Sequence, residues 1–368
     1  MGRLTQSFLK KSEAGTQVYT DDPCIVAGGS QMQRDRIFAL MILAWRALGF
    51  PLSWSKGCRG KLVNWIGGEF RVLSNPTGVR VKIKQDVFQA AASFIEEVRH
   101  LNVLPRKRLP MAIGKLSHIA NLLVPWRPFL TALYAALYGV APGAPADCIW
   151  MKQIARSVEW FHAFFQSSGG LVERTFLLDS HLAKQGAIEL VIDASPWGLA
   201  GILVVDGRCE EFFSDAISDL DVAQFGCAIG SPDGQQIWES LAALIAIRLW
   251  RPRWAEASIQ LKVRGDSITM LTLVVNLRPS TPQLSLIGQE IALEFARCSF
   301  VPIIAEHIPG LANVSADALS RWHQPGHHAF LPAPLTHATR RTCQRRDQRF
   351  YLTLASKIEP NKWVIEGS

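Results

Sequence analysis

Residues 187–195 read AIELVIDAS, a short apolar run that ends in a carboxylate, Asp193. A run of this length, followed by the turn residues of SPWG, predicts a buried β-strand rather than a helix. Folds of the α/β class place their sites at strand ends along one edge of the sheet. A carboxylate at this position is therefore a candidate site residue.

The sequence around this strand predicts an α/β sheet built up in chain order. Further strands are expected in GLAGILVVDG, RCEEFFSD, ASIQLKVRGDS and FVPIIAEHIPG, and helices in IWESLAALIAIRLW, ITMLTLVVNL, SLIGQEIALEFARC and NVSADALSRW. The resulting order is β-β-β-α-β-α-α-β-α, and no internal repeat is evident. The expected fold class is mixed α/β, with a five-stranded mixed sheet and flanking helices over residues 186–323.

Four acidic residues occupy positions in this module where carboxylates can meet. Asp193 ends the first strand, Glu239 lies on the first helix, Asp266 ends the fourth strand and Asp317 opens the last helix. If strands one and four pair in parallel, Asp193 and Asp266 lie side by side. Four adjacent carboxylates repel one another unless metal neutralises them, and such ligands suit Mg²⁺ or Mn²⁺. Each acid alone also fits a strand-end turn or a first helical turn, so the inference depends on the four together.

The module resembles the ribonuclease H domain of retroelement reverse transcriptases. The resemblance is carried by IDASPWGLAGIL, IWESLAALIAIRLW, VRGDSITML and HIPGLANVSADALSR, and the last is similar to gypsy-like and DIRS-like elements. It implies that Asp193, Glu239, Asp266 and Asp317 bind two Mg²⁺ or Mn²⁺ ions and hydrolyse the RNA strand of RNA/DNA hybrids. Relatives carry a histidine in the loop before the last helix, whereas His307 is expected on the preceding strand.

Near the amino terminus, residues 19–22 read YTDD, which alone also suits a polar β-turn. Ahead of a retroelement ribonuclease H, the stretch resembles the Tyr-x-Asp-Asp hairpin of a polymerase palm. The resemblance implies that Asp21 and Asp22 are metal ligands, with Tyr19 leading into the hairpin.

Further stretches follow in the order of that family. ALGFPLSWSK resembles a motif that ends in a lysine, here Lys56, and VNWIGGEF resembles the primer-gripping hairpin, with Trp65 and Gly67. GKLSHIANLLVPWRPFLTALY resembles the thumb and connection. Such a polymerase needs another aspartate well upstream of YTDD, and 18 residues precede Tyr19. We therefore expect the carboxyl-terminal part of a reverse transcriptase, with no RNA-directed DNA polymerase activity from this chain alone.

Composition favours an intracellular protein that binds nucleic acid. The 368 residues, 48% of them hydrophobic, allow two or three domains, and seven scattered cysteines without a CxxC pair fit a reducing compartment. No signal peptide or membrane span is visible, so a cytoplasmic or nuclear location is expected. The net charge is +11 over residues 1–185, −7 over 186–323 and +4 over 324–368. A basic first half suits a polyanion such as an RNA/DNA hybrid or a template–primer duplex.

The expected domains follow these patterns along the chain. They are a partial palm (1–85), a helical thumb or connection (86–165), a linker (166–185), the ribonuclease H-like module (186–323) and a basic, disordered tail (324–368). Within the first two, helices are expected at residues 32–48 and in DVFQAAASFIEEVRHLN, GKLSHIANLL, PFLTALYAALYG and IWMKQIARSVEWFHAFF. Residues 60–83 predict a hairpin joined by SNPTG.

Basic clusters are candidate nucleic-acid contacts. Two clusters stand out, one before a helix and one after the helix that carries Glu239: Arg106, Lys107, Arg108, Arg251 and Arg253. A solvated loop and a basic helix end explain them equally well. Five tail arginines are expected to bind nucleic acid nonspecifically: Arg340, Arg341, Arg345, Arg346 and Arg349. Two alternatives stay open, a catalytically inactive nucleic-acid-binding remnant of a decayed element and another nuclease or an integrase on the same fold.

Overall fold

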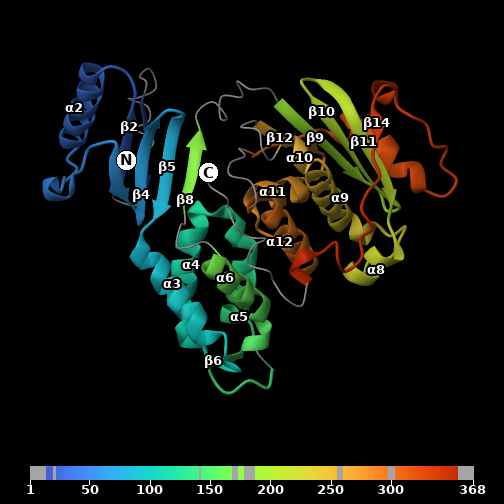
Figure 1. Cartoon of the computed structure of the whole chain (residues 1–368), viewed down its shortest axis with the longest axis horizontal. Helices are drawn as coiled ribbons and strands as arrows, with labels where there is room; N and C mark the ends of the chain where they lie inside the picture. Colours follow the sequence, from blue (N-terminus) through green and yellow to red (C-terminus); the bar gives the residue numbers. More distant parts are fainter. Residues whose placement is uncertain are drawn as a thin grey trace. The chain divides into compact units, whose positions relative to one another are not determined.

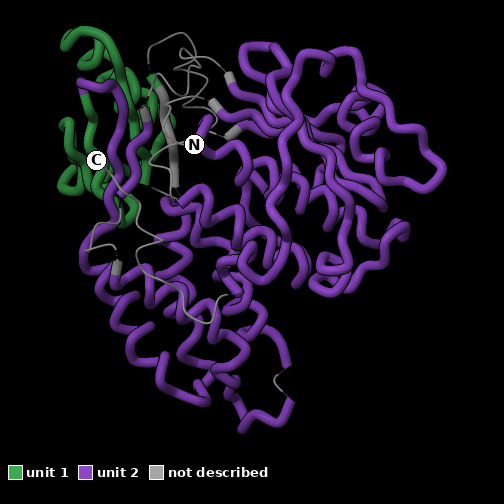
Figure 2. The backbone as a smooth tube through the Cα atoms, turned by 45° about the vertical axis from the view of Figure 1, so that its right-hand side comes forward, with its two compact units in different colours: residues 1–73 green, residues 74–368 purple. Residues whose placement is uncertain are grey.

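The structure is a computed structural model of the 368-residue chain (Figure 1). It describes residues 14–19, 22–140, 142–167, 173–177, 187–254, 260–296 and 303–354. The chain forms two compact units, residues 1–73 and 74–368, which Figure 2 shows in different colours.

The first unit begins with a hairpin and a helix. Strand β1 (Ala14–Tyr19) pairs antiparallel with β2 (Asp22–Ala27), and Tyr19 lies opposite Asp22. Helix α2 (Gln31–Ala47) starts at a capping box, in which Ser30 and Gln33 bond each other's backbone amides. The expected helix at residues 32–48 is confirmed.

A second hairpin in this unit pairs β3 (Leu62–Trp65) with β4 (Gly68–Ser74) after a short 3₁₀ turn, η1 (Trp54–Lys56). The turn between the strands is two residues long, and both have positive φ, 38° at Ile66 and 76° at Gly67. This is the backbone that a tight hairpin turn requires. The sequence pattern predicts one hairpin over residues 60–83, whereas three strands occupy this stretch, because the Ile66–Gly67 turn adds a reversal.

The second unit opens with a helical part. Its strands are β5 (Thr77–Ile83), β6 (Val103–Pro105), β7 (Cys148–Trp150) and β8 (Glu173–Leu177), and its helices are α3 (Gln85–Val98), η2 (Arg106–Arg108), α4 (Leu109–Leu122), η3 (Val124–Trp126), α5 (Arg127–Tyr138), η4 (Met151–Gln153) and α6 (Ala155–Ser167). Proline stands in the first turn of η3, α4 and α5, where its missing amide costs no hydrogen bond. The helices enclose an aromatic core, in which Phe129 stacks on Trp160 at 3.8 Å between ring centroids.

One expected helix begins later than its pattern predicts. The sequence predicts a single helix over residues 149–165, but Cys148–Trp150 form strand β7 and α6 starts only at Ala155. Strand β7 pairs antiparallel with β6, so Ile149 lies opposite Leu104. Both side chains are fully buried. A pairing partner distant in sequence therefore overrides the local helical pattern.

The remaining part of the second unit is a mixed sheet with helices on both faces. The strands lie in the order β13-β12-β9-β10-β11-β14. Their bounds are β9 (Ala187–Ala194), β10 (Gly198–Val205), β11 (Arg208–Ala216), β12 (Gln260–Gly265), β13 (Ile303–His307) and β14 (Thr339–Arg340). Strands β9, β10 and β11 are antiparallel, whereas β12 pairs in parallel with both β9 and β13. The predicted mixed α/β sheet is confirmed, with β14 as a sixth strand.

Successive residues of β10 face opposite sides of the sheet, and their neighbours show which helices cover each side. Its residues Leu199 and Leu203 join the core with α9 (Gln235–Leu249), α11 (Ile268–Asn276) and α12 (Pro282–Ala296). Ala200 and Ile202 point to the other face and pack with Leu319 of α13 (Val314–Ser320). The expected order of strands and helices holds, with the short helices α8 (Asp219–Phe225) and α10 (Arg251–Trp254) in addition.

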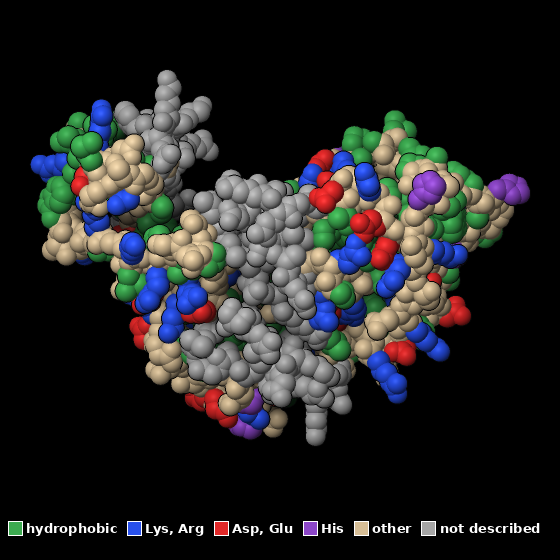
Figure 3. All heavy atoms as spheres, turned by 45° about the horizontal axis from the view of Figure 1, so that its top comes forward, with side chains coloured by type: hydrophobic (Ala, Val, Ile, Leu, Met, Phe, Trp, Pro, Cys, Tyr) green, Lys and Arg blue, Asp and Glu red, His purple; other side chains and the backbone are tan. Residues whose placement is uncertain are grey.

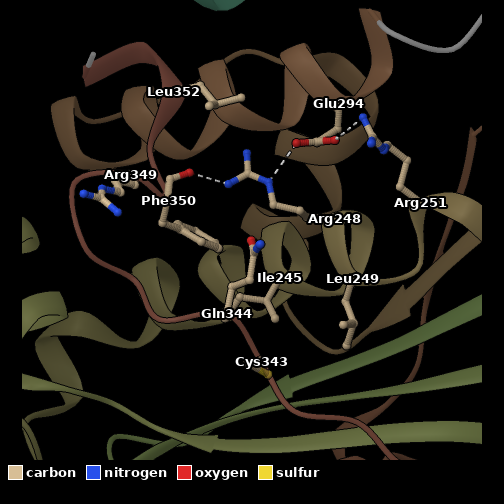
Figure 4. A pocket seen from close by; sticks show the side chains of 10 residues that line it. All are labelled: Ile245, Arg248, Leu249, Arg251, Glu294, Cys343, Gln344, Arg349, Phe350 and Leu352. Carbon is tan, nitrogen blue, oxygen red and sulfur yellow. Dashed lines mark hydrogen bonds and ion pairs between the residues drawn. The ribbon is translucent and has the colours of Figure 1, made fainter. Parts of the chain in front are cut away.

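The prediction of a disordered tail is wrong for residues 324–354. This segment adds β14 to the sheet, and Arg346, Phe350 and Tyr351 are buried. Arg248 of α9 bonds the Phe350 carbonyl and pairs with Glu294 of α12, beside an open hollow of about 470 Å³ (Figure 4). The segment is ordered because its aromatic residues and one arginine complete the core of the module. Residues 355–368 lie outside the described residues.

Two further features bear on function. Helix α12 contacts α5 and η3, so the α/β module packs against the helical part within the same unit. In the part of the chain that the structure describes, no helix combines the length and hydropathy that a membrane crossing requires.

Candidate functional site

Strand pairing brings two of the predicted acids to the same edge of the sheet. Val191 of β9 lies opposite Arg264 of β12 in a parallel pair. Asp193 and Asp266 each stand two residues further along the chain, Asp193 within β9 and Asp266 just after β12, so both lie at the carboxyl ends of adjacent strands. Strands one and four thus pair in parallel, which is the condition under which Asp193 and Asp266 are expected side by side.

Asp193 is held at this edge by two residues that flank Asp317 in sequence. Its side chain is only 6% exposed. Asn313 Nδ2 donates to Asp193 Oδ1 at 3.2 Å, and Ser320 Oγ donates to Asp193 Oδ2 at 2.7 Å. Both carboxylate oxygens therefore have a partner, which compensates for their burial.

Glu239 reaches the same edge from α9. Gln235, one turn earlier on the helix, donates from Nε2 to Glu239 Oε1 at 3.1 Å and to the carbonyl oxygen of Ala194 at 2.6 Å. This side chain ties α9 to the end of β9, next to Asp193. Ser267 caps α11 and also hydrogen-bonds Glu239.

Asp317 lies in the first turn of α13, where a carboxylate complements the helix dipole. It accepts a hydrogen bond from Arg321 Nε at 2.8 Å, and both side chains are partly exposed. Between β13 and α13 the chain passes close to Asp266, since a β-carbon on Gly310 would lie 3.2 Å from Asp266 Oδ2. The loop that leads into α13, the helix of Asp317, therefore passes beside Asp266.

The pKa values of Asp193 and Glu239 are raised by burial and by neighbouring carboxylates. Burial raises the pKa of Asp193 to about 8; the Ser320 hydrogen bond opposes this, while the charges of Asp266, Asp317 and Glu239 add to it. The pKa of Glu239 is also raised, first by burial and further by Asp266, against hydrogen bonds from Ser267 and Gln235. Mutual repulsion of this kind favours a proton or a cation at the site.

The donor chemistry fits a hard divalent ion, although the side chains are not gathered as ligands. Within the described residues, no three acidic, histidine or cysteine side chains are grouped closely enough to hold a metal ion as they stand. Both oxygens of Asp193 accept protein hydrogen bonds, and Asp317 faces Arg321. The set nevertheless consists of four carboxylates, the ligand type that Mg²⁺ and Mn²⁺ prefer.

His307 lies on the strand, as predicted. It is the last residue of β13 and pairs with Gly265, the residue before Asp266. Its side chain is exposed.

The strands on either side of the YTDD stretch, β1 and β2, form an antiparallel pair in the first unit. Tyr19 ends β1 and Asp22 begins β2, while Asp21 lies outside the described residues. Trp65 Nε1 donates to the carbonyl oxygen of Asp22 at 3.1 Å, which joins the predicted primer-gripping hairpin to this one. Gly67 occupies the turn of the β3–β4 hairpin, and Lys56 ends η1 with an exposed side chain.

Most of the predicted nucleic-acid contacts are engaged within the protein. Arg106 donates to the carbonyl oxygens of Leu137 and Gly139 at 2.7 and 2.8 Å. Arg108 pairs with Glu97, Arg251 lies 3.6 Å from Glu294, and Arg253 pairs with Glu210. Lys107 is exposed. On the face of the α/β module seen in Figure 3, basic and acidic side chains are interspersed.

Sequence reasoning missed four polar residues of the site: Gln235, Ser267, Asn313 and Ser320. One signal was available for Gln235, because it stands four residues before Glu239 and so shares its helix face. Asn313 and Ser320 stand four residues before and three after Asp317, but nothing in their spacing points to Asp193.

Comparisons with known proteins give remote likenesses. No protein-family model matches the chain, and neither does any curated protein. The ribonuclease H1 of the archaeon Halobacterium salinarum is 19% identical over 36% of this chain and 94% of its own, with a TM-score of 0.26. The foamy viral protease–reverse transcriptase in complex with double-stranded DNA is 14% identical over 83% of this chain, with a TM-score of 0.36. The chain covers 48% of that viral protein, about half its length. The same viral protein in complex with an RNA/DNA hybrid is 12% identical over 90% of this chain, with a TM-score of 0.33.

Proposed function

We propose that this chain is a metal-dependent endoribonuclease that hydrolyses the RNA strand of RNA/DNA hybrids. One observation carries the proposal: Asp193 and Asp266 lie at the ends of two parallel strands, and burial raises the pKa of Asp193 to about 8, with the charges of Asp266, Asp317 and Glu239 adding to the effect. Four carboxylates at such an edge are the donor set of a nuclease that works with two hard divalent ions.

The roles of the chain's own residues follow from their positions. Asp193 and Asp266 would hold the ions from the strand ends, and Glu239 and Asp317 from α9 and α13. Bound Mg²⁺ or Mn²⁺ supplies an activated water and stabilises the leaving oxygen of a phosphodiester. Gln235, Asn313 and Ser320 fix the carboxylates in place through the hydrogen bonds described above. Preformed positions reduce the reorganisation that ion binding requires.

We further propose that the YTDD hairpin belongs to an incomplete polymerase site, in the manner of a retroelement reverse transcriptase. Trp65 bonds the backbone of Asp22, so the two hairpins of the resemblance are neighbours in the fold. Among the described residues, Asp22 belongs to no group of three or more acidic, histidine or cysteine side chains that could hold a metal ion. Mg²⁺ keeps its waters unless several ligands replace them, so the hairpin alone would bind it weakly.

The decisive experiment is cleavage of defined duplexes by the purified 368-residue chain. With Mg²⁺ or Mn²⁺ it should cut the RNA strand of an RNA/DNA hybrid and leave single-stranded RNA and duplex DNA intact. Asp193→Asn and Asp266→Asn should each lower the rate about 100-fold or more, because losing a ligand costs at least as much as losing its outer-shell partner. Asp233→Asn, an exposed acid of the same module that bonds Ser231, is the matched control and should cut normally.

The experiment also separates the alternative. A catalytically inactive remnant would bind the hybrid with salt-dependent affinity but show no metal-dependent cutting. Cutting of duplex DNA in place of the hybrid would instead favour another nuclease on the same fold.

A further inference from the structure

Three buried serine hydroxyls join the end of helix α13 to the sheet. Ser195 Oγ, just after β9, donates to the carbonyl oxygen of Ser320 at 2.7 Å. Ser214 Oγ, on β11, donates to the carbonyl oxygen of Leu319 at 2.7 Å. In the opposite direction, from the helix to the sheet, Ser320 Oγ donates a hydrogen bond to Asp193 Oδ2 at 2.7 Å. Two of these hydroxyls thus hold helix backbone, and the third holds a site carboxylate.

Burial leaves these hydroxyls without competition from solvent. The exposed fractions of Ser195, Ser214 and Ser320 are 3%, 6% and 0%. A serine hydroxyl has one hydrogen, and Ser320 Oγ also lies 3.0 Å from the carbonyl oxygen of Asp317. The contact with Asp193 is shorter, as expected for a bond to a carboxylate. Its main partner is therefore Asp193.

The backbone is shaped to allow this approach. A β-carbon on Gly198 of β10 would collide with the carbonyl oxygen of Ser320 and lie 2.9 Å from His323 Cδ2. Only glycine at this position lets the end of α13 lie directly on the sheet. The position of the Ser320 hydroxyl is therefore fixed by backbone packing as well as by its own bonds.

The same short helix holds Asp193 from both of its ends. Asn313 occupies the N-cap position of α13, but its side chain makes no capping hydrogen bond. Instead, Asn313 Nδ2 donates to Ile192 O at 3.1 Å and to Asp193 Oδ1 at 3.2 Å. Ser320, at the carboxyl end, bonds Asp193 Oδ2. Asp317 lies between them on the same helix. The separation between the carboxylates of Asp193 and Asp317 therefore depends on these two contacts.

We infer that Ser320 is a positioning residue: its hydroxyl restrains the Asp193 carboxylate relative to Asp317 at the site proposed to hold a divalent ion. The inference rests on the proposed function, since it concerns the metal ligands of that site. It assigns Ser320 no contact with substrate. Removing an outer-shell partner of this kind typically lowers metal affinity about 10- to 100-fold.

The test compares Ser320→Ala with Ser214→Ala in the full chain. Both changes delete a buried hydroxyl that bonds at 2.7 Å near the end of α13, but only Ser320 bonds a carboxylate. Mn²⁺ binding is measured by calorimetry without nucleic acid, and hybrid cleavage is measured over a range of Mg²⁺ concentrations. Ser320→Ala should weaken Mn²⁺ binding about 10-fold and raise the Mg²⁺ concentration for half-maximal cleavage to match. Ser214→Ala should bind Mn²⁺ as the wild type does.

A second variant covers the case in which Ser320→Ala does not fold. Ser320→Cys keeps the shape and a weak S–H donor, so its Mn²⁺ affinity should be lower than that of the wild type, but by less than about 10-fold. Wild-type Mn²⁺ affinity in a folded Ser320→Ala or Ser320→Cys protein would overturn the inference and leave the proposed function standing. An equal loss of Mn²⁺ affinity in Ser214→Ala would also overturn it, because the loss would then come from disturbing the end of α13 and not from removing the bond to Asp193. A wild-type chain that binds no Mn²⁺ would overturn both.

Discussion

The guanidinium of Arg346 faces the carboxylate of Asp221 side-on: Nε lies 2.8 Å from Oδ1, and Nη2 lies 2.8 Å from Oδ2. Arg346 is 5% exposed and Asp221 is fully buried. Arg346 also pairs with Asp215 and donates to the carbonyl oxygen of Ala216 at 2.6 Å. Two acids and a backbone carbonyl thus fix one residue of the carboxyl-terminal segment in the α/β module.

Breaking this pair should destabilise the module strongly. Arg346→Met leaves Asp221 buried without a counter-charge, and loss of one partner of a buried pair costs about 3–5 kcal/mol. The free energy of unfolding, measured in urea, should fall by that amount. Arg349→Met, an exposed arginine of the same segment, is the control and should change it by less than about 0.5 kcal/mol. Equal effects of the two changes would show that the segment does not depend on this pair.

Stability should fall as pH rises through the titration of Asp193. The folded-state pKa of about 8 lies above the ordinary value of 3.8, so between these values the folded chain binds a proton that the unfolded chain has lost. This contribution is fully present below about pH 4 and is lost as pH rises through about 8. Compared with Asp193→Asn, the wild type should lose free energy of unfolding from about pH 5 to about pH 9 in EDTA. Excess Mg²⁺ should reduce the loss, because the ion binds the folded state. A difference between the two proteins that does not change with pH would contradict the prediction.

Replacing either of two glycines with alanine should change the free energy of unfolding, but in opposite directions. At Gly198 the added methyl collides with the carbonyl oxygen of Ser320, so Gly198→Ala should displace α13, destabilise the chain and slow hybrid cleavage. Gly114 lies inside α4, and apart from its chain neighbours and the backbone of its own helix, no atom of the described residues lies within 4 Å of the place that an added methyl would take. Gly114→Ala should raise the free energy of unfolding by about 0.5–1 kcal/mol and leave cleavage unchanged. Thermal unfolding and hybrid cleavage, measured on both variants, check the pair.

Exposed cations of the helical part should contribute to hybrid affinity by neutralising phosphates. Lys107, Lys152 and Arg156 are exposed there. Changing all three to glutamine should weaken binding and reduce the slope of log K against log salt by up to about 0.9 for each phosphate that is no longer neutralised. Lys262→Gln is the control, because Lys262 pairs with Glu189 and Glu306. An unchanged slope in the triple variant would show that the hybrid binds elsewhere.

Primer extension should give no product with this chain. Asp22→Asn should leave hybrid cleavage within about twofold of the wild type, because Asp22 is not one of the four carboxylates proposed to hold the ions and, among the described residues, shares no partner with them. Extension of a template–primer by the wild-type chain, abolished in Asp22→Asn, would mean that another residue completes the metal site of the hairpin.

The layout of the sheet could be predicted because it follows from local patterns. Apolar runs that end in Asp193 and Asp266 predict two parallel strands with their acids at one edge, and the pairing of β9 with β12 agrees. The hydrogen bonds that hold Asp193 could not be predicted. A serine at residue 320 has the same local appearance whether its hydroxyl meets solvent, its own helix or a strand across the core.

The errors in the prediction have the same origin. Arg346 stands among exposed arginines, Arg345 and Arg349, and composition cannot distinguish it from them. Its burial depends on Asp221, which is far away in sequence. Similarly, Ile149 lies in a pattern that favours a helix, and its pairing opposite Leu104 decides the outcome.

The distance in sequence between Asp221 and Arg346 has a consequence for synthesis. A ribosome releases the first five strands of the sheet, α9, α12 and α13 before it releases residue 346. Until then, Asp221 cannot form its ion pair with Arg346, and Phe350 and Tyr351 are absent from the core that they complete. The module therefore cannot reach its final packing before residue 346 has been made. A chain that stops at Ser320 would carry every carboxylate of the candidate site, yet its sheet would lack β14 and the side chains of Arg346, Phe350 and Tyr351.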